Sequence, residues 1–152
     1  MNPFRYSISL RLRHPSIDPE KISAALGETP RFSWKAGERR RTPTGQSLDG
    51  LNDTTYWCSK SINGGGFDLA STIRVALESL ESHRLFLTGF CSSGGEVEYF
   101  IGWYTDGRNT GETFDSDLLK RLADLGIDLA FDVYGVEQPV VPPVESTIIR
   151  GA

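Results

Sequence analysis

The sequence predicts an α+β domain, built on a mostly antiparallel sheet with its helices on one face. Apolar and polar residues alternate over 4–13 and 127–134, which is typical of strands with one buried face. Apolar residues recur instead at helical spacing from about 68 to 82 and again shortly before 127–134. With shorter strand-like segments, these patterns predict the order β-α-β-β-α-β-β-α-β, a ferredoxin-like unit elaborated by a further strand, helix and strand.

The first predicted strand and helix, 4–13 and 18–26, have the clearest local signals. The strand places its arginines and serines on the face opposite its apolar residues. Asp18 is a good N-cap, Pro19 suits the first helical position, and Gly27 suits the left-handed turn that ends a helix. One short helix is therefore expected directly after the first strand.

The next part of the chain is predicted to be short strands separated by loops. Residues 30–35 form a strand with two aromatic side chains on one face. Residues 38–53 are polar and contain arginine, glycine and proline, so an exposed loop is expected there. Strand character returns at 54–62, and the glycine-rich residues 63–66 are predicted to break it.

The second half of the chain is predicted to hold a long helix and a hairpin. The helix spans about 68–82. Segments 84–91 and 96–104 are predicted to be antiparallel strands, because the Ser-Ser-Gly-Gly sequence at 92–95 suits a tight hairpin. The side chains expected in the core, on the helix-covered face, are Ile8, Leu10, Ile73, Leu77, Leu118, Leu122 and Phe131.

A last helix, capped by Asp115 or Ser116, and the strand 127–134 complete the predicted domain. The composition then becomes rich in proline and branched apolar residues. We predict one domain over 1–135 and a proline-rich tail over 136–152 that packs on its own domain or on a neighbouring copy.

Length and residue usage favour a protein of the reducing cytoplasm. A chain of 152 residues can bury about two thirds of its unfolded surface, so it needs no disulfide. Cys58 and Cys91 lie in apolar, strand-like runs and are expected to be buried thiols, whereas His14 and His83 are expected at the surface. No apolar run approaches the roughly 18 to 20 residues that cross a bilayer, and the chain begins without a signal-like segment. A cytoplasmic protein without a membrane partner is predicted.

Charge is distributed unevenly along the chain. The net charge is −4, which disfavours a constitutive nucleic-acid binder. Residues 1–60 nevertheless hold ten Lys and Arg against six Asp and Glu, while residues 61–152 hold six against fourteen. The molecule is therefore expected to be dipolar and able to steer a charged partner.

Several short motifs are spread along the sequence between residues 5 and 135. They are Asp18-Pro19 before a helix that ends Ala25-Leu26-Gly27, then Pro30, Trp34, Lys35, Gly37-Glu38, Arg39, Trp57, Leu122-Ala123-Asp124-Leu125-Gly126 and Asp132-Val133-Tyr134. On these features the chain resembles a bacterial family, the domain of unknown function 4279. The resemblance implies an α+β fold and a cytoplasmic bacterial setting. It carries no chemistry onto particular residues, and the proline-rich tail departs from the family's usual ending.

The best candidate site is a basic, tryptophan-bearing corner that begins with Trp34. Its guanidinium groups and aromatic faces suit the recognition of carboxylates, phosphates or stacked rings. The alternative is that Trp34 anchors the core and the arginines belong to a solvated loop. The residues assigned to ligand binding are Trp34, Lys35, Arg39, Arg40, Arg41 and Trp57.

Other chemistry is less well supported by the sequence. The glycines of 64–66 could present N–H groups to an anion, but a flexible connection explains them as well. Glu96 with Glu98, and Asp128 with Asp132, project in pairs from strand faces, where they could bind a cation or share a proton. Solvated charges, or partners of strand arginines, are the alternative. No cofactor, metal or catalytic residue is predicted.

These observations favour a non-enzymatic binding or interaction module, of the immunity or regulatory kind, that uses the Trp/Arg corner. The alternative is a small-molecule or phosphoryl-group enzyme with its pocket at the same corner. The expected partner is another protein or an anionic ligand, and a homodimer through the sheet face or the tail is left open.

Overall fold

The structure, a computed structural model, describes residues 2–136, so the predicted tail lies outside the described residues except for Val136. Within this range six strands form one sheet. They are β1 (Phe4–His14), β2 (Phe32–Trp34), β5 (Thr55–Cys58), β6 (Ile62–Gly66), β7 (Glu96–Tyr104) and β8 (Ile127–Tyr134).

The long strand β1 organises the sheet, whose order is β2-β5-β1-β7-β8. On one side β1 pairs antiparallel with β6 along its first half and with β5 along its second half. On its other side it pairs antiparallel with β7 over nine residue pairs. Strand β8 runs parallel to β7, so the predicted sheet, antiparallel for the most part, is confirmed.

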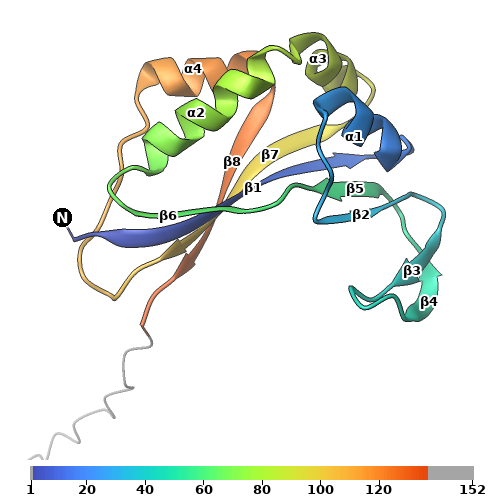
Figure 1. Cartoon of the computed structure of the whole chain (residues 1–152), viewed down its shortest axis with the longest axis horizontal. Helices are drawn as coiled ribbons and strands as arrows, with labels where there is room; N and C mark the ends of the chain where they lie inside the picture. The colour runs from blue at the N-terminus through green and yellow to red at the C-terminus, as the bar shows by residue number, and fades with distance from the viewer. Residues whose placement is uncertain (1, 137–152) are drawn as a thin grey trace, which may run out of the picture.

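The helices lie together on one face of this sheet (Figure 1). They are α1 (Pro19–Leu26), α2 (Leu69–Glu81), α3 (Arg84–Ser92) and α4 (Ser116–Asp124). Their apolar sides pack on the alternating side chains of the strands and form the core. The opposite face has no helix over it in the described part of the chain, and a small hairpin, β3 (Arg39–Arg41) with β4 (Ser47–Leu51), projects from beneath β2 (Figure 1).

The predicted helix signals act as expected. The Asp18 side chain accepts a hydrogen bond from the Glu20 N–H at 3.0 Å, and Gly27 ends α1 with φ of 68°. Asp115, rather than Ser116, caps α4 and accepts from the Leu118 N–H at 3.0 Å. These caps fix where both helices begin.

The ferredoxin-like order is not confirmed, because the segment predicted as strand 84–91 is helix α3. Leu87 and Phe90 are buried three residues apart, whereas Leu85 is 90% exposed, which is a helical rather than an alternating pattern. A short apolar run fits either structure, and here the helical periodicity prevails. Ser92 is the last residue of α3, and residues 93–95 connect this helix to β7, so 92–95 is not a hairpin turn.

Two predicted irregular segments are also regular in the structure. The loop 38–53 contains the β3–β4 hairpin, with Gly45 and Gly50 at positive φ. The glycines of 63–66 form β6 against β1. A Cβ on Gly64 would lie 2.3 Å from the Tyr6 hydroxyl oxygen, so glycine makes room for this buried ring.

Six of the seven predicted core side chains are buried. Phe131 is the error, because it is 41% exposed. It lies on β8, the last strand of the sheet, and contacts only the rings of Trp103 and Phe114 among the described aromatic side chains. No described helix has the length and apolarity to span a membrane.

Candidate functional site

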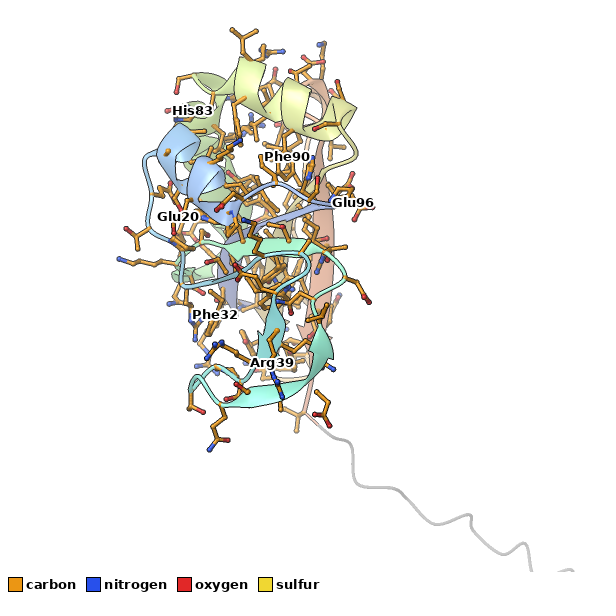
Figure 2. The ribbon with its side chains drawn as sticks, turned by 90° about the vertical axis from the view of Figure 1, so that its right-hand side faces the viewer. Glu20, Phe32, Arg39, His83, Phe90 and Glu96 are labelled. Atoms are coloured by element: carbon orange, nitrogen blue, oxygen red, sulfur yellow. The ribbon has the colours of Figure 1, made fainter. Side chains whose placement is uncertain are left out.

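The candidate site lies on the face of the sheet opposite the helices. Every second side chain of a strand points to this face, and the register places Trp34 of β2 beside Tyr56 of β5. Figure 2 shows Phe32 and Arg39 at the hairpin end of the molecule, far from Phe90 in the helix layer. The sheet and the hairpin together bound two hollows.

The first, which we call the sheet-face hollow, has a volume of about 400 Å³. Its floor comes from β1, β5 and β7, and its wall comes from β2 and the hairpin turn. Polar hydroxyls, aromatic rings and two guanidinium groups line it. The lining residues are Ser7, Ser9, Arg11, Arg31, Phe32, Trp34, Pro43, Tyr56, Cys58, Ser61, Phe100, Gly102, Tyr104 and Tyr134.

The second, which we call the hairpin hollow, has a volume of about 670 Å³ and lies between β2 and the β3–β4 hairpin. Arg31, Phe32, Trp34 and Pro43 line both hollows, so the two are contiguous. The other lining residues are Ser33, Glu38, Arg39, Arg41, Thr42, Gly45 and Asn52.

Arg11 is the most constrained cation of the sheet-face hollow. Its guanidinium carbon lies 3.4 Å from the centroid of the Phe100 ring, a close cation–π contact. Its Nε is shielded from solvent and has no hydrogen-bond partner in the described chain. The neighbouring carboxylate, Glu98, pairs instead with Arg13 at 3.3 Å. The guanidinium group of Arg11 therefore packs against an aromatic ring and has no described counter-ion.

Trp34 and Tyr56 form an aromatic wall, with ring centroids 4.4 Å apart. Burial, followed by a hydrogen bond to Cys58, raises the pKa of Tyr56 to about 12. This phenol therefore stays protonated at neutral pH. It contributes a ring face and a neutral hydroxyl to the hollow.

A second aromatic pair lies at the other end of the same face. The rings of Tyr104 and Tyr134 stack at 4.9 Å. The Tyr134 hydroxyl donates to the Asp132 carboxylate, and this bond is the main reason that the pKa of Tyr134 is raised. Asp132 is thus bonded at the rim and does not line either hollow.

Three of the predicted site residues meet at the hollows. Trp34 is 44% exposed and lines both, so it is not a core anchor. Arg39 and Arg41 line the hairpin hollow. Arg40 points elsewhere and donates to the Asp49 carbonyl oxygen at 3.5 Å, which helps to hold the hairpin together.

Two other predicted site residues, Lys35 and Trp57, interact within the fold and do not line the hollows. Lys35 forms an ion pair with Asp18 at 3.1 Å, and the pKa of Lys35 is raised by this hydrogen bond. Trp57 is fully buried on the helix-covered face and donates from Nε1 to the Ser23 hydroxyl at 3.0 Å. The assignment of Trp57 to the site is therefore wrong, because side chains alternate along β5, so that Tyr56 faces the hollow and Trp57 faces the core.

The sequence-based interpretation missed the floor of the sheet-face hollow. Arg11, Tyr56, Phe100 and Tyr104 come from three strands that are far apart in the sequence. A signal was present, since aromatic residues on the polar side of an alternating strand, such as Phe100 and Tyr104, are atypical of a solvated face.

Within residues 2–136, His14 has a structural position. His14 is buried, contrary to the prediction of a surface position. Its Nδ1 accepts from the Ser16 and Ile17 N–H groups, both at 3.0 Å, and burial lowers its pKa. In the same residues, no group of three or more His, Cys, Asp or Glu side chains could hold a metal ion.

The fold and the two hollows define an α+β domain with a pocketed, arginine-rich sheet face. The chain belongs to the family described as Domain of unknown function (DUF4279), whose model matches residues 4–136. Neither the comparison with curated proteins nor the comparison with solved structures finds a match.

Proposed function

We propose that this chain is a non-enzymatic binding module that holds an anionic partner against its open sheet face. One observation carries the proposal. Four arginines, Arg11, Arg31, Arg39 and Arg41, line the two hollows, and Glu38 is the single carboxylate among the described lining residues. None of the four forms an ion pair within residues 2–136.

The stacking of these arginines supports the same proposal. A guanidinium group that lies flat on a ring keeps the N–H donors at its edge available for a carboxylate or phosphate. The guanidinium carbon of Arg11 lies 3.4 Å from the Phe100 ring centroid, and that of Arg31 lies 5.0 Å from the Phe32 ring centroid. The rings hold the cations in place without neutralising them, which suits recognition of an anion.

The alternative is an enzyme that uses the same hollows. General acid–base chemistry needs a carboxylate, imidazole or comparable group within hydrogen-bond reach of the reacting atoms. The described lining of the two hollows has no imidazole and a single carboxylate, Glu38, which lies in the hairpin hollow and not in the sheet-face hollow. Its serines, tyrosines and arginines are groups that bind and orient, so the binding module is preferred.

The proposal is tested with the full-length chain as bait in a cell extract, followed by measurement of association rates for each captured partner. The double variant Arg39→Glu/Arg41→Glu should slow association much more than it speeds dissociation, and binding should weaken with salt. The control is Arg84→Glu/Lys120→Glu, which changes charge equally in the helix layer. A partner that binds both variants at the wild-type rate would show that the hollows are not its site.

A further inference from the structure

The two hollows are contiguous but offer different chemistry. The sheet-face hollow is lined mainly by rings and hydroxyl groups, with Arg11 over the Phe100 ring as part of its floor. The hairpin hollow has few rings and gathers Arg39 and Arg41 with Arg31 at its boundary. A ligand that fills both must therefore combine a flat, hydrogen-bonding part with a charged part.

The sheet-face hollow suits a planar heterocycle. Aromatic side chains and a guanidinium plane are the surfaces on which nucleobases stack. Trp34 and Phe32 are 44% and 39% exposed, so both rings have surface left for a ligand. Hydroxyl groups of Ser7, Ser9 and the neutral Tyr56 lie around this volume, where they can bond the polar edge of a base.

The hairpin hollow suits phosphate groups. Arg39 and Arg41 both line this hollow, although the β3–β4 pairing shifts register between them. Arg39 uses its Nε to donate to the Leu48 carbonyl oxygen at 3.2 Å, which leaves its terminal nitrogens without a described bond. Arginine pairs with phosphate through two parallel N–H donors.

We infer that the two hollows form one site for a nucleoside polyphosphate, with the base in the sheet-face hollow and the phosphates beside Arg39 and Arg41. The inference rests on the proposed function and names its ligand. The two volumes, about 400 and about 670 Å³, lie in the range of small-molecule pockets.

The surroundings of the site favour a small ligand over a nucleic-acid strand. Asp128 and Asp132 project to the same sheet face as Glu98 and Gly102, their register partners on β7. Gly102 lines the sheet-face hollow, so the Asp132 carboxylate lies at the β8 edge of this hollow. A phosphate chain that continued past the hollow in this direction would meet like charge, which disfavours a longer polyanion.

The test is calorimetric titration of the full-length chain with ATP, adenosine, inorganic tripolyphosphate and a short single-stranded oligodeoxythymidylate. ATP should bind saturably, and adenosine and tripolyphosphate should each bind at least about tenfold more weakly, because each supplies half of the contacts. Arg41→Gln should weaken ATP about tenfold and leave adenosine unchanged. Trp34→Leu should weaken ATP and adenosine about tenfold and leave tripolyphosphate unchanged.

The matched control is Lys120→Gln, which removes one positive charge from α4 and should change none of these affinities. Thermal unfolding of each variant establishes that it is folded. Absence of ATP binding at millimolar concentration, equal binding of ATP and tripolyphosphate, or tighter binding of the oligonucleotide would each overturn the inference. Equal binding of ATP and tripolyphosphate, with sensitivity to Arg41→Gln, would leave the proposed anion-binding function standing.

Discussion

The arginines that join α2 to α4 and those that line the two hollows have opposite surroundings. In the helix layer, Arg74 bonds both Asp115 and Asp117 near the start of α4, and Arg121 pairs with Glu81 at 2.8 Å. These contacts tie α2 to α4, so the charge of each arginine is matched within the fold. In the helix layer, these arginines therefore have a structural role.

In the two hollows the charge is not matched, whereas Arg13, elsewhere on the same sheet face, pairs with Glu98 at 3.3 Å. Arg11 and Arg31 lie against rings, and Arg41 has no described ion pair. Uncompensated like charges repel and cost stability, and residues kept for binding commonly carry such a cost. The difference supports the proposal that the sheet face binds a partner, whereas the helix layer stabilises the domain.

The largest expected contrast is in packing. Leu77→Ala on α2, or Leu122→Ala on α4, should lower the free energy of unfolding by about 2 to 5 kcal/mol, because each removes a buried side chain and leaves a cavity. Trp34→Ala on the open face should cost only about 1 kcal/mol, mainly the stacking with Tyr56. Chemical denaturation measures all three. If Trp34→Ala lowers the free energy of unfolding as much as the leucine variants do, Trp34 is a core residue and the two layers do not differ in packing.

The next contrast compares two strand glycines that face opposite sides of the sheet. Gly64→Ala would place a Cβ 2.3 Å from the Tyr6 hydroxyl oxygen, which bonds Asp68 at 2.9 Å and cannot move freely. We expect a loss of about 1 to 3 kcal/mol, as for other overpacked sites. Thermal unfolding is the measurement.

The matched change is Gly102→Ala, in the sheet-face hollow. Its nearest neighbour would be the Tyr104 hydroxyl oxygen at 3.1 Å, at the end of a half-exposed side chain that can shift. The unfolding temperature should change little. If Gly102→Ala destabilises the domain as much as Gly64→Ala, the open face is packed as rigidly as the core and is a poor binding surface.

The sequence was sufficient to predict the layers, but not every element. Alternation in β1 and the caps at Asp18 and Asp115 identify the strand and both helices, because these signals are local. Segment 84–91 was misassigned because a short apolar run satisfies strand and helix patterns alike. Its helical structure depends on Leu87 and Phe90 packing into the core.

The candidate site was predictable only in part, for a similar reason. Trp34, Arg39 and Arg41 are close in the sequence, so composition alone draws attention to them. Arg11 and Phe100 become neighbours only through the pairing of β1 with β7. Register is a property of the folded sheet, so no local pattern could have joined those two residues.

The smallest expected effect tests the charge comparison directly. Arg74→Gln removes a guanidinium group that bonds Asp115 and Asp117, so the unfolding temperature should fall slightly, and less so at high salt, because exposed pairs are screened. Arg41→Gln removes an uncompensated charge and should leave the unfolding temperature unchanged or raise it. Changing the arginine rather than Asp115 is deliberate, since Asp115 also caps α4. Parallel thermal scans of both variants at low and high salt decide the matter, and a salt-dependent fall for Arg41→Gln would show that Arg41 has a counter-ion and a structural role like that of Arg74.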